Sequence, residues 1–100
     1  MYIFIYGTLK STEGNNYILA GADSSYVGEA ETVEGYTLKY QMYPELHKSR
    51  LGVVVGELWE VSEDGLEVLD RFEGVPSLYY RAPINIKGIQ DECQAYFKTL

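Results

Sequence analysis

The sequence contains little cysteine and histidine: Cys93 is its only cysteine and His47 its only histidine. A single thiol cannot form an internal disulfide, so we expect a protein of the reducing cytoplasm. One thiol and one imidazole also exclude a zinc site made of cysteine and histidine ligands. Neither residue lies in a context that favours a role. We expect His47 on a polar surface loop and Cys93 buried as a small apolar side chain.

Positive charge is also scarce, because eight lysine and arginine residues stand against fifteen acidic residues, for a net charge of −7. No basic cluster interrupts this balance, so we expect neither nucleic acid nor a membrane as a partner. Runs of 18 apolar residues are missing, and the start of the chain lacks the basic region of a signal peptide. These features predict a soluble protein.

The length of 100 residues is that of a single domain, and we expect one domain over residues 1–100. Gly56 interrupts the strongest strand pattern, which predicts a bulge or a bend there. The fold class is therefore α+β with a small closed barrel. Strands are expected at 2–6, 25–30, 36–40, 51–61, 79–86 and 93–97, with a short helix at 15–20 and one clear helix ending at 73.

The clear helix ends on a carboxylate, Glu73. Its apolar residues recur at Leu66, Leu69 and Phe72, Ser62 is the expected N-cap, and Gly74 the expected stop. A carboxylate at the negative end of a helix and beside apolar side chains has a raised pKa, which suits proton transfer near neutral pH. A solvated glutamate without function is the alternative interpretation of the same pattern.

A second candidate feature follows the first strand, where Gly7 and Thr8 end a continuously apolar run. The backbone N–H groups of Gly7, Thr8 and Leu9 can converge there on an anion or a polarised carbonyl, although a plain turn explains the pattern as well. The chain also carries ten tyrosines. Most are expected on half-buried strands, and some can line a pocket.

Taken together, several motifs resemble the γ-glutamylcyclotransferase-like family, and most closely its small branch of γ-glutamylamine cyclotransferases. The motifs occur in the family's order and with its spacing, over nearly the whole chain. They are Phe4-Ile5-Tyr6-Gly7-Thr8-Leu9, Tyr43-Pro44-Glu45-Leu46, Gly56-Glu57-Leu58-Trp59-Glu60-Val61, Leu69-Asp70-Arg71-Phe72-Glu73-Gly74 and Tyr79-Tyr80-Arg81.

The resemblance implies a small mixed β-barrel with flanking short helices and a pocket at one end. It also implies an enzyme for a small-molecule substrate that needs no metal or cofactor. The α-amine of a γ-glutamyl group attacks its own γ-carbonyl, which releases pyroglutamate (5-oxoproline) and an amine or amino acid. Such a reaction needs no Ser-His or Cys-His pair, because the nucleophile belongs to the substrate.

The resemblance also assigns residues. Glu73 matches the family's general acid/base, Tyr79 a pocket tyrosine, and Asn15 a polar position that follows the binding loop. Arg81 matches as well, and neutralisation of a neighbouring acid is the alternative role for this strand residue. The substrate-binding loop corresponds to Tyr6, Gly7, Thr8 and Leu9.

Two departures from the family pattern leave other functions open. The run Lys10-Ser11-Thr12-Glu13-Gly14 replaces a basic, glycine-containing segment of relatives, and the chain ends at Leu100, directly after the last strand. The main alternative is a protein that binds a small metabolite or signalling molecule without transforming it. An interaction protein that uses an exposed sheet edge is a further possibility. We expect a monomer, because no long apolar face remains unassigned.

Overall fold

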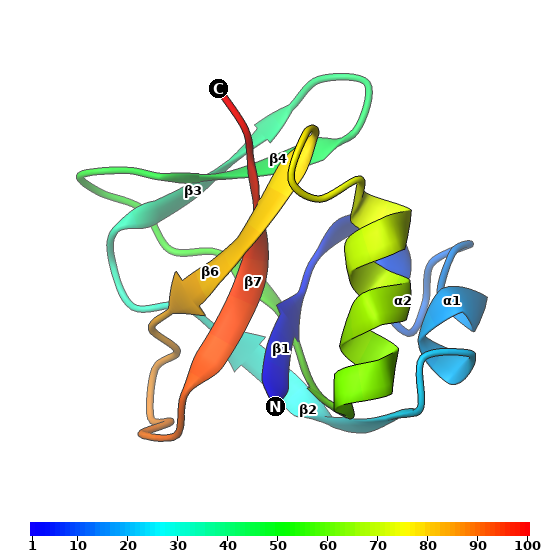
Figure 1. Ribbon diagram of the computed structural model, residues 1–100. Coiled ribbons are helices and arrows are strands. Elements are labelled where there is room, and N and C mark those ends of the chain that lie inside the picture. The colour runs from blue at the N-terminus through cyan, green and yellow to red at the C-terminus, as the bar shows by residue number, and fades with distance from the viewer.

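The computed structural model describes residues 1–100, except for the side chain of Thr8. Seven strands, two α-helices and one 3-10 helix follow one another along the chain (Figure 1). Their order is β1 (Tyr2–Ile5), η1 (Gly7–Leu9), α1 (Tyr17–Ala20), β2 (Ser24–Glu31), β3 (Tyr36–Tyr40), β4 (Pro44–Lys48), β5 (Val55–Val61), α2 (Glu63–Glu73), β6 (Tyr79–Ile84) and β7 (Cys93–Lys98). The predicted α+β class is confirmed.

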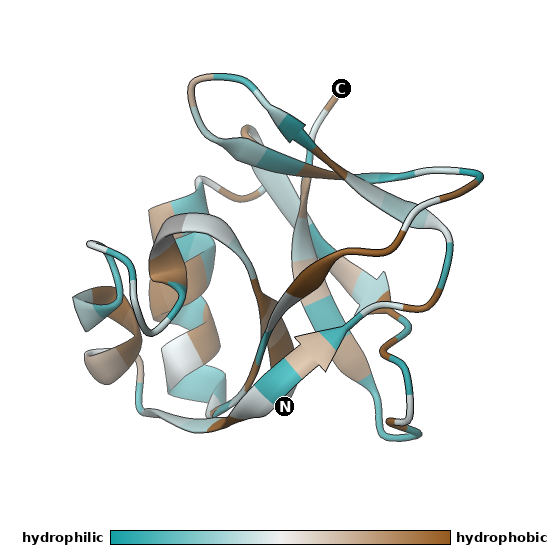
Figure 2. Ribbon diagram, turned by 180° about the vertical axis from the view of Figure 1, so that it is seen from behind, coloured by the Kyte–Doolittle hydropathy of each residue, from teal (hydrophilic) through white to brown (hydrophobic). Residues whose placement is uncertain are grey.

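Strand β1 lies at the centre of a five-stranded sheet with the order β2-β5-β1-β7-β6. It runs antiparallel to β5 and parallel to β7. Ile3 and Ile5 pack into one core cluster, whereas Phe4 between them packs into a second cluster on the other face. This burial on both faces is what the uninterrupted apolar run predicts, and Figure 2 shows the hydrophobic colour through the middle of the sheet.

Strands β3 and β4 form a separate two-stranded hairpin. The prediction of β3 is confirmed. The expectation that His47 lies in a polar loop is wrong, because His47 is a half-buried residue of β4 and pairs with Thr37. Leu46 is the only fully buried residue of β4, so the segment lacks the alternating apolar pattern that identifies a strand.

Two details of strand β5 differ from the prediction. The strand begins at Val55, whereas residues 51–54 are not in a strand, and Gly52 among them has a φ of +114°. The bulge expected at Gly56 is instead on β2, between Tyr26 and Gly28. Gly56 is needed for close approach, because a Cβ there would lie 2.3 Å from the carbonyl oxygen of Ile5.

Over the described residues the strands form a curled sheet, which differs from the expected closed barrel. Its edge strands are β2 and β6, and the ends of these strands meet at a single bridge between Thr32 and Ile86. A backbone hydrogen bond of 3.0 Å from Lys87 to Glu31 supports that bridge. The sheet is therefore joined edge to edge at one end only, and it curls around the second core cluster.

Helix α2 lies on the other face of the sheet, with the short helix α1 beside it (Figure 1). Both of its predicted ends are confirmed: the Ser62 side chain accepts a hydrogen bond of 3.1 Å from the Gly65 amide, and Gly74 has a φ of +70°. Helix α1 is confirmed too, but the Asn16 side chain does not cap it. Instead, Asn16 Nδ2 donates to the carbonyl oxygen of Leu9, at 2.9 Å.

Within the described part of the chain, no helix combines the length and the apolar character that crossing a bilayer requires.

Candidate active site

A cavity of about 320 Å³ opens where the 3-10 helix η1, the start of β4, the end of α2 and the start of β6 come together. These segments lie far apart in the sequence, and the end of α2 faces the β3–β4 hairpin in Figure 1. The volume is at the lower end of the range for sites that enclose a small molecule.

The cavity brings together the residues that the sequence singled out. Six of the seven predicted site residues line it: Tyr6, Gly7, Leu9, Asn15, Glu73 and Tyr79. The seventh is Thr8, whose side chain lies outside the described residues. Four further lining residues were not predicted: Tyr43, Pro44, Phe72 and Leu78.

Among the described residues that line the cavity, Glu73 is the only one with an acidic or basic side chain. It occupies the last position of α2, and its side chain is partly buried. Burial raises the pKa of Glu73 to about 7, from an ordinary value near 4.5. Among the described residues no cation forms an ion pair with it. Glu73 can therefore exist in either protonation state near neutral pH and can both accept and donate a proton.

Two tyrosine hydroxyls accompany the carboxyl group. Tyr6 donates a hydrogen bond to the backbone oxygen of Tyr96, and Tyr79 donates one of 3.3 Å to the backbone oxygen of Pro44. Burial raises the pKa of both tyrosines, and the negative charge of Glu73 raises it further. Both hydroxyls therefore keep their protons at neutral pH, and both lie within the electrostatic reach of Glu73.

The 3-10 helix η1 places backbone next to the cavity. Gly7 has a φ of +71°, and a Cβ at this position would lie 3.4 Å from the ring of Pro44. Glycine thus serves both the turn and the close approach of the hairpin. The first residues of a helix leave N–H groups without partners inside the helix, and the side chain of the N-cap residue Tyr6 makes no capping hydrogen bond to η1.

The loop after η1 is anchored by a buried carboxylate that the sequence analysis missed. Glu57 accepts hydrogen bonds from the Ser11 amide at 2.8 Å, from the Ser11 hydroxyl at 2.6 Å and from Trp59 Nε1 at 3.1 Å. Burial alone would raise the pKa of Glu57, but these hydrogen bonds lower it overall. The segment that departs from the family pattern is therefore held in place by a charged, fully hydrogen-bonded side chain.

A second network fixes α2 against the sheet. Asp70, one turn before Glu73, receives two hydrogen bonds from Arg81, at 2.9 and 3.2 Å, and one of 2.7 Å from the Tyr96 hydroxyl. Burial opposes ionisation of Asp70, but these donors hold its pKa below the ordinary value. Arg81 thus neutralises a neighbouring acid, which was one of its two predicted roles. The partners lie on β6 and β7, so sequence spacing gave no signal for this network.

The histidine and the cysteine both lie away from the cavity. His47 Nε2 contacts Glu45 at 3.3 Å on strand β4. Cys93 is buried, as predicted, and burial together with nearby Asp91 and Glu92 raises the pKa of its thiol. Among the described residues, no group of three or more histidine, cysteine or acidic side chains is placed to hold a metal ion.

Comparison with known proteins agrees with this geometry. The family model described as gamma-glutamyl cyclotransferase, AIG2-like, matches residues 3–100. A gamma-glutamylaminecyclotransferase of Rattus norvegicus is 33% identical, over 91% of this chain and 66% of the relative. A putative gamma-glutamylcyclotransferase of Methanocaldococcus jannaschii is 30% identical, over 96% of this chain and 82% of the relative.

A solved structure shows the same fold. The crystal structure of an AIG2-like protein from Mus musculus aligns with a TM-score of 0.85 at 29% identity, over 98% of this chain and 76% of that chain. The matches confirm the resemblance drawn from the motifs. At the level of the family, they also confirm the expectation of a cyclotransferase-type enzyme.

Proposed function

Because the chain belongs to the gamma-glutamyl cyclotransferase, AIG2-like family, we propose that it cyclises a small γ-glutamyl compound and releases 5-oxoproline together with a free amine or amino acid. The observation that carries the proposal is the environment of Glu73. Burial raises the pKa of this carboxyl group to about 7, in a cavity that it shares with two tyrosine hydroxyls. A group with this pKa can accept and return a proton within one reaction.

The reaction requires one bond to form and one to break at the same carbon. The Glu73 carboxylate takes a proton from the α-ammonium of the substrate, and the resulting amine attacks the γ-carbonyl carbon. A tetrahedral intermediate forms with a negative charge on the former carbonyl oxygen. When the bond to the leaving nitrogen breaks, Glu73 returns the proton to that nitrogen. The ring nitrogen, which became positively charged in the attack, gives its surplus proton to the departing amine, so that a neutral five-membered lactam and an ammonium ion remain. Holding amine and carbonyl in one cavity favours this intramolecular attack.

The other predicted site residues take binding roles in this proposal. Backbone N–H groups of Gly7, Thr8 and Leu9 hold the substrate carboxylate or the developing oxyanion. The hydroxyls of Tyr6 and Tyr79 donate their protons to backbone oxygens, so their own oxygens accept hydrogen bonds from N–H groups of the substrate. Support for these roles comes from the position of Gly7, Leu9 and both tyrosines on the cavity wall. Asn15 also lines the wall, and we assign it a contact with the glutamyl group.

The proposal predicts 5-oxoproline in the products. Wild-type protein is incubated with γ-glutamyl amides and γ-glutamyl dipeptides, and 5-oxoproline and the released amine are measured by mass spectrometry. We expect equal amounts of the two products from at least one compound. Stabilisation of the protein in a thermal shift assay by a compound that is recovered intact would instead support a protein that binds without catalysis.

A further inference from the structure

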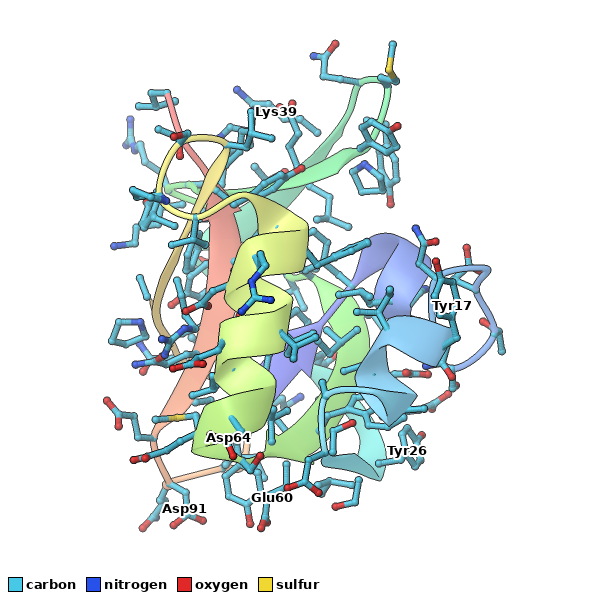
Figure 3. All side chains as sticks on the ribbon, turned by 45° about the vertical axis from the view of Figure 1, so that its right-hand side comes forward. Tyr17, Tyr26, Lys39, Glu60, Asp64 and Asp91 are labelled. Atoms are coloured by element: carbon cyan, nitrogen blue, oxygen red, sulfur yellow. The ribbon has the colours of Figure 1, made fainter. Side chains whose placement is uncertain are left out.

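Tyr96 on strand β7 contacts both the helix that carries Glu73 and a hydroxyl group of the cavity. It is 2% exposed, belongs to the core cluster that packs against α2 and does not line the cavity. Its hydroxyl donates a hydrogen bond of 2.7 Å to Asp70 Oδ1 on α2, and its backbone oxygen accepts the hydrogen bond from Tyr6. Figure 3 shows α2, whose first turn carries Asp64, next to β7. The proposed reaction does not use Tyr96.

Asp70 closes the turn that contains Glu73. The backbone oxygen of Asp70 accepts a hydrogen bond of 3.0 Å from the Val75 amide, so Glu73 lies inside a closed turn that begins at Asp70. The side chain of Asp70 accepts one hydrogen bond from Tyr96 and two from Arg81. The last turn of α2 is therefore tied to both β6 and β7 through a single residue.

The pKa of Glu73 depends on how firmly its carboxyl group is held in the cavity. Burial is what raises this pKa to about 7. The titratable groups that feel its charge from neighbouring elements are tyrosines before η1, on β6 and on β7, namely Tyr6, Tyr79 and Tyr96. Glu45 on β4 adds to the rise in pKa at Tyr6 and Tyr79. If the last turn of α2 moved outward, water would reach the carboxylate, and the pKa of Glu73 would fall toward 4.5.

We propose that Tyr96 and Asp70 are positioning residues of this site: the hydrogen bond between them fixes the last turn of α2 against β7 and so holds the Glu73 carboxyl group inside the cavity. Neither residue lines the cavity, so both act through Glu73 and not on the substrate. The role rests on the proposed function, in which Glu73 transfers the proton. Arg81 is a second support, because its guanidinium helps to keep the Asp70 carboxylate charged and in place.

Tyr96→Phe removes one hydroxyl group and leaves the ring, the backbone oxygen and every charge in place. We expect kcat for 5-oxoproline release to fall about tenfold, because a small displacement of the proton-transferring group slows the reaction, whereas KM should stay within about twofold. Tyr36→Phe is the matched control. Tyr36 is 8% exposed, its hydroxyl accepts a hydrogen bond of 3.1 Å from the Asn85 amide, and it does not line the cavity. The melting temperature of this control should fall by a similar amount, but its kcat should equal that of wild type. Equal kcat in the two variants would overturn the proposal.

Substitution of Asp70 tests whether the two residues act together. Asp70→Ala removes the acceptor of the Tyr96 hydroxyl, so kcat should fall at least as far as in Tyr96→Phe. Adding Tyr96→Phe to Asp70→Ala should then leave kcat unchanged, because two residues that act through one hydrogen bond do not have additive effects. Asp70→Asn keeps an acceptor oxygen for Tyr96 and should retain a higher kcat than Asp70→Ala. A further loss of about tenfold in the double variant would contradict the proposal.

Titration of the Glu73 carboxyl carbon by nuclear magnetic resonance needs no substrate and separates the positioning role from the proposed function. In wild type we expect a midpoint near the pKa of about 7. In Tyr96→Phe the midpoint should move down by at least about 0.5 on the pH scale, which the unchanged charges cannot cause. In Tyr36→Phe it should stay at the wild-type value. This result supports the positioning role even if wild type releases no 5-oxoproline, in which case the proposed function alone fails. An unchanged midpoint in Tyr96→Phe overturns the positioning role, even in an active cyclotransferase.

Discussion

Glu73→Gln is expected to reduce kcat for 5-oxoproline release by at least about a hundredfold, the lower range for removal of a general acid/base. Glutamine has the shape of protonated glutamate but cannot take up a proton from the substrate amine. The cavity wall is otherwise preserved, so KM should change little, which separates a lost transition-state interaction from lost binding. Steady-state kinetics of 5-oxoproline release by mass spectrometry measures both constants.

Glu67→Gln is the matched control, because Glu67 lies on the exposed side of the same helix. It should keep the wild-type kcat.

The fold of Glu73→Gln is checked by its melting temperature at pH 8. Because the folded-state pKa of Glu73 is raised to about 7, the stabilisation linked to its protonation is present below about 4.5 and is lost as the pH rises through 7. The neutral variant should therefore melt no lower than wild type at pH 8. Wild-type kcat in Glu73→Gln would refute the assigned role.

Gly65→Ala is expected to destabilise the protein by about 3 kcal/mol or more, since overpacking against backbone cannot be relieved by a change of rotamer. Gly65 is buried in the first turn of α2. A Cβ there would lie 1.7 Å from the carbonyl oxygen of Ala22 and 2.6 Å from Val61 Cγ1. The helix would have to move away from the sheet to accept even one methyl group. Urea unfolding followed by circular dichroism measures the loss.

Gly14→Ala is the control for the glycine substitution itself. No atom lies within 4 Å of a Cβ at position 14, and the backbone there does not require glycine. Its unfolding free energy should stay within about 0.5 kcal/mol of wild type. If Gly65→Ala unfolded at the same urea concentration as Gly14→Ala, this result would contradict the close packing of Gly65 against the backbone of Ala22.

Elements with a strong local pattern could be predicted from the sequence. Strand β1 is a continuous apolar run, and α2 combines apolar spacing with a serine cap and a terminal glycine, so both were predicted nearly to their ends. Strand β4 was missed because Leu46 is its only fully buried residue. The start of β5 was placed too early because Val53 and Val54 continue its apolar run, although they lie outside the strand.

The site was predictable only in part, because some of its contacts join residues that lie far apart in the sequence. Glu73 and the segment at Gly7 carry local signals, namely a helix end and a strand that stops at glycine. The ion pair between Asp70 and Arg81 joins α2 to β6, so it follows from tertiary packing and from no pattern along the chain. The same is true of Tyr43 and Leu78, which line the same cavity although they lie far apart in the sequence. Sequence patterns report on neighbours along the chain, whereas these contacts depend on how the elements pack.

The pH dependence of kcat/KM for 5-oxoproline release tests the central claim about Glu73 most directly. The carboxylate is the form that accepts the proton, and burial raises the pKa of Glu73 to about 7. The rate constant should therefore rise between pH 5 and 8 with an apparent pKa near 7, and this limb should be absent from any residual activity of Glu73→Gln. A profile that is flat from pH 5 to 8, or one that shows the same limb in Glu73→Gln, would contradict the assignment of Glu73 as the proton carrier.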